Sequence, residues 1–154
     1  LVDIAVGTSP MDSNKKLHTT VLSTLREVPV CSMNFNIKNE ISLKELSYYP
    51  IISLSSGTST FDFYLEEFLK HGCNYAPDIE AATADQIMPL VKYGLGIGFV
   101  PEQFLEDEND IRTISLTEPM ATRDILLVRK KGHTLPLPAR ELVDLINEQL
   151  PTKD

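Results

Sequence analysis

The sequence predicts an α/β fold with largely parallel sheets, and three observations support this prediction. Short apolar, β-branched segments alternate along the chain with segments whose apolar residues recur at helical spacing. No internal repeat or low-complexity tract interrupts this alternation. Hydrophobic residues make up 42% and charged residues 23% of the 154 residues, a composition typical of globular proteins. A chain of this length can form one domain or two small lobes.

The first third of the chain is predicted to be mostly extended. A strand is expected at residues 2–6 and a polar surface loop at 12–16. A long extended segment follows at 21–33, and one short helical turn is expected at 41–46. Pro29 should break the long segment near its middle, because proline cannot donate a backbone hydrogen bond to a neighbouring strand. A segment of this length is suited to crossing between two lobes.

Two strand–helix units are expected next. The first has a buried strand at 51–54 and a helix that ends at Gly72. The apolar face of this helix comprises Phe61, Tyr64, Leu65, Phe68 and Leu69. The second unit has a strand at 79–82 and a helix that opens with a capping box, because Thr83 is followed three residues later by Gln86.

The last part of the chain is predicted to return to strands and to end in a helix. Pro89 should first bend the helix after Thr83, since it removes one backbone hydrogen bond. Strands are expected at 97–100, 111–116 and 125–128, and a final helix is expected at 138–150. The apolar face of this final helix comprises Leu142, Leu145, Ile146 and Leu150.

The turn Ser55-Ser56-Gly57-Thr58-Ser59 is the most informative local feature. It begins a helix, and a helix N-terminus holds anions because its unpaired N–H groups carry a partial positive charge. Gly57 allows close approach of the backbone to a ligand, and the four hydroxyl groups offer hydrogen bonds. Ordinary N-capping accounts for one of these hydroxyls. The turn is therefore a candidate anion site, with the structural explanation open beside it.

Thr83 and the turn Gly7-Thr8-Ser9 allow the same two interpretations. Each follows a predicted strand, and Thr83 also begins a helix. Ligands of parallel α/β sheets bind beyond the carboxyl ends of the strands. The three hydroxyl-rich turns could therefore converge on one cleft, and we expect the strands before Ser55 and Thr83 to be neighbours.

The glycines Gly94, Gly96 and Gly98 do not favour nucleotide binding. The dinucleotide fingerprint places its glycines after a strand and before a helix, whereas here a predicted helix precedes them and a strand follows. A tight helix-to-strand turn explains these glycines better.

Catalysis and metal binding find little support. No catalytic motif and no cofactor motif is present, and the acidic side chains at 66–67, 106–108 and 110 are expected to be solvated. The histidines lack metal-ligand spacing; they are His18, His71 and His133. We therefore expect neither an enzyme nor a cofactor or metal site.

The net charge and the cysteines narrow the class of protein further. A charge of −8, from 22 acidic and 14 basic residues, disfavours DNA binding by this segment itself. No apolar run reaches membrane-spanning length. Cys31 and Cys73 do not make a disulfide framework, which indicates a reduced, cytoplasmic protein. The chain begins without Met and inside a strand-like run, which we interpret as the start of a fragment.

Four stretches, in their order and spacing, resemble the effector-binding domain of LysR-type transcriptional regulators. The stretch at 91–101 is similar to the family's pattern of valine, spaced glycines, isoleucine and a closing proline. The segments at 2–6, 28–32 and 41–46 resemble, in turn, an apolar strand with a leading Asp, the strand crossing between lobes, and a short leucine-containing turn.

The resemblance implies a two-lobed fold like that of type 2 periplasmic binding proteins, with an effector in the interlobe cleft. Residues 30–124 would form lobe II, and residues 1–29 and 125–154 would form part of lobe I, whose first portion is missing. The effector contacts implied are Thr8, Ser9, Cys31, Ser55, Ser56, Gly57, Thr58, Ser59, Thr83, Phe99 and Val100. Of these, Cys31, Phe99 and Val100 rest on the resemblance alone.

The resemblance also implies partners. The effector would be a small polar or anionic metabolite, such as a carboxylate or an amino acid, and its binding would control a DNA-bound homodimer or tetramer. DNA would be held only by an N-terminal helix-turn-helix that this chain lacks, and no membrane contact is expected. The alternative is a periplasmic solute-binding protein of a transporter, which a signal peptide before Leu1 would identify. A third possibility is an enzyme on this fold, which would need a catalytic acid or histidine in the cleft.

Overall fold

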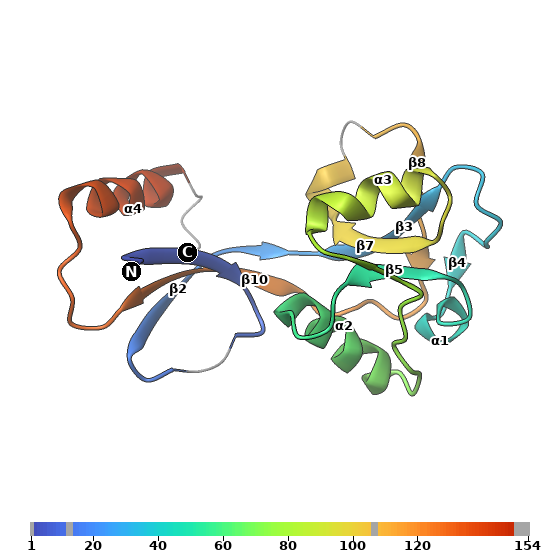
Figure 1. Cartoon of the computed structure of the whole chain (residues 1–154), viewed down its shortest axis with the longest axis horizontal. Coiled ribbons are helices and arrows are strands. Elements are labelled where there is room, and N and C mark those ends of the chain that lie inside the picture. Colours follow the sequence, from blue (N-terminus) through green and yellow to red (C-terminus); the bar gives the residue numbers. More distant parts are fainter. Residues whose placement is uncertain (1, 12–13, 106–107, 150–154) are drawn as a thin grey trace. The chain divides into compact units, whose positions relative to one another are not determined.

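The computed structural model describes residues 2–11, 14–105 and 108–149 (Figure 1). The chain divides into two compact units, which are described separately. Unit 1 comprises Leu1–Leu25 and Arg123–Asp154, and unit 2 comprises Arg26–Thr122. The chain therefore passes from one unit to the other twice, at Leu25–Arg26 and at Thr122–Arg123.

In the residues that the structure describes, unit 1 contains a three-stranded antiparallel sheet and one helix. The strands are β1 (Ile4–Thr8), β2 (Leu17–Leu25) and β10 (Arg123–Lys130), in the order β1-β10-β2. The central strand β10 carries the buried residues of this sheet, among them Leu126 and Leu127. The predicted strands at 2–6 and 125–128 are confirmed, with shifted ends. The predicted loop at 12–16 falls partly outside the described residues.

The final helix of unit 1, α4 (Leu137–Gln149), lies where the apolar spacing predicts it. None of its described side chains is buried, and Leu142 and Leu145 are 49% and 56% exposed. Leu150, the fourth member of its predicted apolar face, lies outside the described residues.

Unit 2 is built around a five-stranded sheet in the order β6-β5-β7-β3-β8. Its strands are β3 (Glu27–Ser32), β5 (Ile51–Leu54), β6 (Ile79–Ala81), β7 (Ile97–Pro101) and β8 (Ile111–Thr113). A smaller parallel pair joins β4 (Glu40–Ile41) to β9 (Ser115–Leu116). The segment predicted at 111–116 is therefore two strands, β8 and β9, in two different sheets.

Only part of the sheet structure is parallel, so the prediction of largely parallel sheets is wrong in this respect. Strands β6, β5 and β7 pair in parallel, whereas β3 pairs antiparallel with both β7 and β8, and the sheet of unit 1 is wholly antiparallel. Parallel neighbours need a crossover connection, usually a helix. Helix α2 (Ser59–Lys70) lies between β5 and β6 along the chain, and α3 (Ile87–Lys92) lies between β6 and β7, so these parallel strands have the crossover connections that they need.

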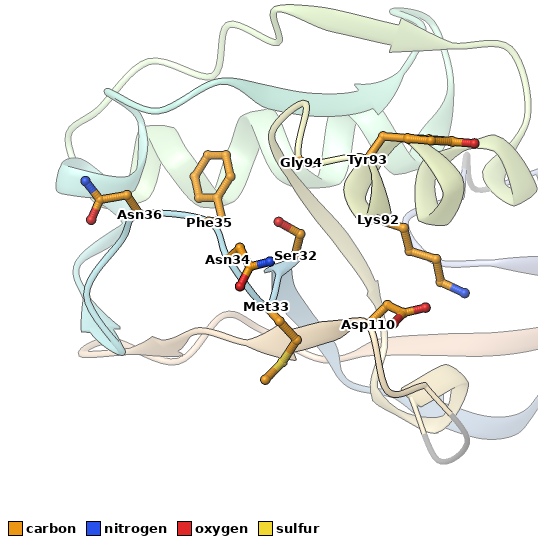
Figure 2. Close-up of a pocket in the computed structure, with 9 residues that line it drawn as sticks. All are labelled: Ser32, Met33, Asn34, Phe35, Asn36, Lys92, Tyr93, Gly94 and Asp110. Atoms are coloured by element: carbon orange, nitrogen blue, oxygen red, sulfur yellow. The ribbon is translucent and has the colours of Figure 1, made fainter.

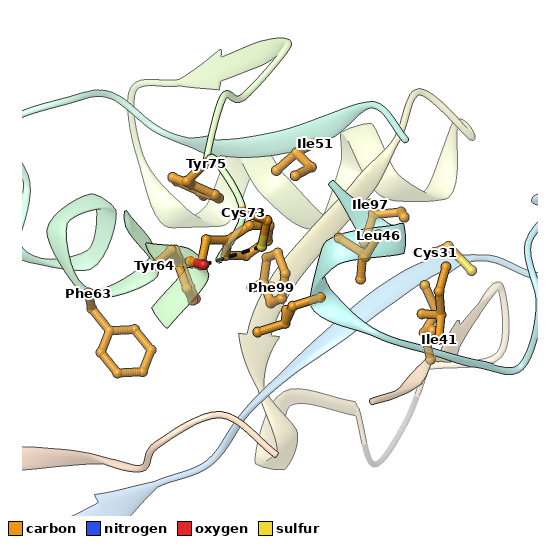
Figure 3. Packing of buried hydrophobic residues seen from close by; sticks show 13 residues of the cluster. Cys31, Ile41, Leu46, Ile51, Phe63, Tyr64, Cys73, Tyr75, Ile97 and Phe99 are labelled. Atoms are coloured by element: carbon orange, nitrogen blue, oxygen red, sulfur yellow. Dashed lines mark hydrogen bonds between the residues drawn. The ribbon is translucent and has the colours of Figure 1, made fainter. Parts of the chain in front are cut away.

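Two helices cover opposite faces of the unit 2 sheet (Figure 1). Helix α2 (Ser59–Lys70) packs Phe63, Tyr64 and Phe68 into a cluster that includes Phe99 (Figure 3). Helix α3 (Ile87–Lys92) contributes to the second cluster, which contains Val30 and Val100. A fully buried side chain of this size stabilises the fold by roughly 1.5–3 kcal/mol. The two clusters make unit 2 a three-layered α/β core.

The predicted face of α2 is partly wrong. Tyr64 and Phe68 are buried as expected, but Leu69 is 57% exposed, and Phe63 and Glu67 take buried places on the helix. The predicted end of the helix is confirmed by Gly72, which follows the C-cap with a φ of 71°.

Pro29 does not break the extended segment as predicted. It lies inside β3 opposite Phe99, and the interruption comes at Arg26, between β2 and β3. The carbonyl of Pro29 accepts a hydrogen bond from the Ile114 amide, and ladder pairing with β8 begins only at Val30. The missing N–H of the proline therefore falls where no β8 partner is required.

The capping box predicted at Thr83 is not formed. Thr83 makes no side-chain capping bond, and Gln86 instead accepts a hydrogen bond from the Ala82 amide. The segment begins as a 3-10 turn, η1 (Ala84–Gln86), before α3. Pro89 therefore lies in the first turn of α3, where its N–H would have no helical partner, so the predicted bend is not needed.

A true capping box stands elsewhere, at α1 (Leu43–Leu46), the short helical turn predicted at 41–46. The Ser42 hydroxyl accepts a hydrogen bond from the Glu45 amide, and the Glu45 carboxylate accepts one from the Ser42 amide. Ser42 and Glu45 have the required spacing of three residues, so the sequence contained this signal.

The three spaced glycines form the tight helix-to-strand turn that the sequence predicts. Gly94 has a φ of 74°, which other residues rarely adopt. A Cβ on Gly96 would lie 2.6 Å from the Pro50 carbonyl oxygen, and one on Gly98 would lie 2.7 Å from Ile87 Cγ2. The glycines therefore allow α3 and the start of β5 to approach β7 closely.

Candidate functional site

The two hydroxyl-rich turns of unit 2 follow neighbouring strands. Strands β5 and β6 pair in parallel with Leu54 opposite Ala81, so the turn at Ser55–Ser59 and Thr83 lie beyond the same edge of the sheet. This confirms that the strands before them are neighbours. We call this edge, from the end of β6 to the start of β3, the carboxyl edge of unit 2. The convergence of the Thr8–Ser9 turn, which belongs to unit 1, stays a prediction.

Thr58 supplies the N-cap of α2, as the structural explanation of this turn requires. Its Oγ1 accepts a hydrogen bond from the Phe61 amide and donates one to the Ser55 carbonyl, both at 3.1 Å. The hydroxyls of Ser55, Ser56 and Ser59 make no hydrogen bond to the part of the chain that the structure describes. Capping therefore uses one of four hydroxyls and leaves three for other partners.

Gly57 and Thr83 are also accessible at this edge. Gly57 has a φ of 87°, and no atom lies within 4 Å of where its Cβ would be. Thr83 is exposed and does not cap its helix. Its hydroxyl is therefore not committed to the helix end that the sequence suggested.

Sequence reasoning missed two charged residues at the carboxyl edge. Because β3 runs antiparallel to β7, its first residue Glu27 pairs with Pro101, which brings Arg26 beside Glu102. Arg26 and Glu102 form an ion pair at 3.7 Å, with side chains 65% and 53% exposed. The Ser55–Ser59 turn itself contains no Arg or Lys. Arg26 immediately precedes β3, an antiparallel strand whose neighbours in the sheet no local pattern revealed.

Three predicted contact residues of unit 2 lie in its core. Cys31 and Phe99 are buried on the α2 side of the sheet, and Val100 is buried on the α3 side. The Phe99 ring lies 4.9 Å from that of Tyr64, centroid to centroid. Burial raises the pKa of the Cys31 thiol, and Arg112 opposes this shift only in part, so the thiol is not an activated nucleophile. Effector contact by these three residues stays a prediction.

Thr8 and Ser9 are tied to the start of β10 within unit 1. Arg123 donates from Nε to the Ser9 carbonyl at 2.7 Å and from Nη2 to Thr8 Oγ1 at 2.6 Å. Ser9 Oγ accepts a hydrogen bond from the Asp124 amide at 2.8 Å. Ser9 also lines a cavity of about 400 Å³ in this unit, together with Asn14, Lys15 and others. The hydroxyls of Thr8 and Ser9 therefore have structural partners.

A larger pocket of about 510 Å³ lies elsewhere in unit 2 (Figure 2). Its lining residues include Ser32 at the end of β3 and Gly94 before β7, which places it at the edge of the sheet opposite the carboxyl edge. Lys92, which also lines it, is paired with Glu108 at 2.6 Å. None of the predicted contact residues lines this pocket.

Two further findings concern metals and membranes. In residues 2–11, 14–105 and 108–149, no group of three or more His, Cys, Asp or Glu side chains is placed to hold a metal ion. Within the same described ranges, no helix is both long and apolar enough to cross a membrane.

The fold matches solved structures of regulatory domains at low sequence identity. The chain is similar to the regulatory domain of Synechocystis PCC6803 CcmR in complex with 2-PG, with a TM-score of 0.84, 15% identity, and coverage of 97% of this chain and 74% of that chain. The chain is also similar to the effector binding domain of QuiR in complex with shikimate, with a TM-score of 0.82 and 17% identity. The match covers 97% of this chain and 74% of that chain. At these identities the likeness establishes the fold alone.

The chain spans only part of longer regulators. It covers 54% of HinK, a LysR family transcriptional regulator from Pseudomonas aeruginosa, with a TM-score of 0.77, 21% identity and coverage of 98% of this chain. No curated protein matches the sequence. The family model for the LysR substrate binding domain, however, matches residues 1–151. The chain therefore belongs to the LysR substrate binding domain family.

Proposed function

We propose that this chain is the ligand-sensing part of a cytoplasmic LysR-type transcriptional regulator, and that it binds a small polar or anionic effector at the carboxyl edge of unit 2. One observation carries the proposal. The turn at Ser55–Ser59 and the exposed Thr83 follow the neighbouring parallel strands β5 and β6, the position where α/β sheets bind ligands.

The chemistry of this edge favours an anionic group. The N-terminus of α2 offers backbone N–H groups and a partial positive charge. The hydroxyls of Ser55, Ser56 and Ser59 can donate to the same ligand, and the open backbone at Gly57 allows close approach. Arg26 can turn toward a carboxylate, because an exposed ion pair such as that with Glu102 contributes little stability. A carboxylate or amino-acid-like effector fits these groups.

The remaining parts of the proposal rest on family membership. In the intact regulator, effector binding would alter the conformation of a DNA-bound homo-oligomer, and a separate helix-turn-helix would contact the DNA. The interlobe cleft and the contacts from Cys31, Phe99 and Val100 remain predictions of the family resemblance. Contacts from Thr8 and Ser9, which the sequence of their turn also suggested, remain predictions as well. The family match favours the regulator over the alternative of a solute-binding protein.

Calorimetric titration tests the proposed site. The probes are shikimate, inorganic phosphate and a panel of amino acids and dicarboxylates, added to the wild-type chain and to the double variant Ser56→Ala/Thr83→Ala. Both side chains are exposed, so the fold should tolerate their loss. We expect at least one probe to bind the wild type and the double variant to lose tenfold or more in affinity, about 1.4 kcal/mol.

A matched control removes two exposed hydroxyls of unit 1, in the variant Thr20→Ala/Thr134→Ala. It should bind the same probe with unchanged affinity. Equal affinity of the wild type and the Ser56→Ala/Thr83→Ala variant would reject the site. Absence of binding by every probe would count against effector binding by this chain.

A further inference from the structure

Helix α2 is hydrogen-bonded to both ends of unit 2. The Tyr64 hydroxyl donates to the Glu27 carboxylate at 2.8 Å, and Glu27 is the second residue of the unit. The Glu67 carboxylate accepts a hydrogen bond from the Ala121 amide at 2.8 Å, and Ala121 is the next-to-last residue of the unit. One helix therefore contacts the segments through which the chain enters and leaves unit 2.

The Tyr64–Glu27 hydrogen bond is buried, and the Glu67–Ala121 hydrogen bond is partly buried. Tyr64 and Glu67 are each 2% exposed, and Glu27 is 7% exposed. The sequence suggested that Glu67 is a solvated surface charge, and this is wrong. Taking a carboxylate out of water is costly unless its oxygens are hydrogen-bonded. The second oxygen of Glu67 accepts from Lys70 at 2.7 Å, so both of its oxygens are used.

The ionisation of Glu67 agrees with this arrangement. Burial alone would raise the pKa of its carboxyl, but the hydrogen bonds from Lys70 and the Ala121 amide, with the charge of Lys70, outweigh burial and hold the pKa below its ordinary value. The carboxylate is therefore charged at neutral pH and remains a strong acceptor for the Ala121 amide.

The spacing of the two side chains makes the helix a rigid link. Tyr64 and Glu67 are three residues apart, so they lie on the same face of α2. The same helix begins at Thr58, in the turn proposed above to bind an effector. A displacement of this turn moves the helix as a body, because the N–H···O=C ladder of α2 is continuous from Ser59 to Lys70.

We infer that Tyr64 and Glu67 are positioning residues that transmit a change at the Ser55–Ser59 turn to both chain connections of unit 2, at Arg26 and Thr122. The inference rests on the proposed function for the identity of the turn as the effector site. The transmission itself depends only on the contacts of α2. It gives the two hydrogen bonds a regulatory role beyond the stability of the core.

Amide hydrogen exchange tests the link without any ligand. Thr58→Ala removes the N-cap of α2 and loosens the turn. In the wild-type background we expect amide exchange to rise in three places: in residues 59–62, in residues 27–31 and at Ala121. The expected rise is about fivefold, the factor that corresponds to the loss of one cap. In the Tyr64→Phe/Glu67→Ala background, the same change should raise exchange in 59–62 alone. The transmission is rejected if Thr58→Ala raises exchange in 59–62 and leaves the two end segments unchanged in the wild-type background.

Two further variants separate positioning from simple destabilisation. Glu67→Gln keeps an acceptor for the Ala121 amide and should restore most of the response that Glu67→Ala loses. Glu66→Ala, at the exposed neighbouring position, should leave the response intact. Loss of the response in Glu66→Ala would show a general loosening of α2 and overturn the assignment. Because no ligand is added, failure here is distinct from failure of the proposed effector site.

Discussion

Helices α2 and α4 are of similar length and have apolar residues at helical spacing, yet they are packed very differently. Helix α2 has 12 residues and buries Phe63, Tyr64, Glu67 and Phe68. Helix α4 has 13 residues, and none of the side chains described in it is buried. The residue pattern of each helix shows which side is apolar. It does not show whether an apolar layer is present to cover that side.

The difference lies in what each helix meets. Helix α2 packs against the face of the unit 2 sheet that carries Ile51, Ile97 and Phe99 (Figure 3). In unit 1, the outer strands β1 and β2 instead expose Val6 and Val21, at 59% and 51%. Hydrophobic burial scales with the area removed from water, so α2 contributes to the core of its unit and α4 contributes little.

The largest expected effect tests this contrast directly. Phe68→Ala in α2 should lower the free energy of unfolding by about 3–5 kcal/mol, because Phe68 is fully buried and its loss leaves a cavity. Leu145→Ala in α4 is the matched control and should change it by less than about 0.5 kcal/mol. Urea unfolding followed by circular dichroism measures both. Comparable losses in the two variants would mean that α4 is covered after all.

The sheets of the two units offer a second contrast. Gly98→Ala in β7 should destabilise the fold by about 1–3 kcal/mol, since the new methyl group would lie 2.7–2.8 Å from Ile87 and Val91 of α3. Gly7→Ala in β1 meets only the end of Met11, at 3.9 Å, and should be neutral or slightly stabilising. Thermal unfolding of both variants checks this, and a tolerated Gly98→Ala would contradict close packing of α3 on β7.

A smaller effect is expected at the start of α2, where it measures how much the N-cap contributes to stability. Thr58→Ala should cost about 1 kcal/mol, because the Phe61 amide loses its acceptor. Thr83→Ala, at a position that looked like a cap in the sequence, should stay within about 0.5 kcal/mol. Chemical denaturation distinguishes the two values. A loss of about 1 kcal/mol in Thr83→Ala would show that this threonine caps its helix in solution.

The smallest effect concerns pH and the buried carboxylate of α2. The pKa of Glu67 is lower in the folded protein than its ordinary value, so its ionisation stabilises the fold above the ordinary glutamate pKa, and this contribution is lost as the pH falls through the folded-state pKa. The difference in unfolding free energy between wild type and Glu67→Gln should therefore stay constant near neutral pH and narrow as the pH falls below the ordinary glutamate pKa of 4.5. For the exposed control Glu66→Gln the difference should remain small throughout. A difference that widens on acidification would contradict the lowered pKa.

Sequence reasoning recovered much of the architecture and part of the candidate site. Strand β5 and the start and end of α2 were predicted, because their signals lie within a few neighbouring residues. The glycine turn before β7 was predicted for the same reason. Arg26 and the buried Glu67 were missed, because each owes its environment to a segment far away in the chain, β7 in one case and the residues around Ala121 in the other.

The sequence by itself determined most of the order of the elements, the two hydroxyl-rich turns after neighbouring strands, and the family to which the chain belongs. Only the tertiary structure decided that β3 runs antiparallel to β7, that Pro29 is accommodated within a strand, and that α2 is covered while α4 is not. The physical reason is the distance along the chain over which each interaction acts. Propensity, capping and turn chemistry act between residues close in sequence, whereas strand direction and burial depend on which distant segment is the neighbour.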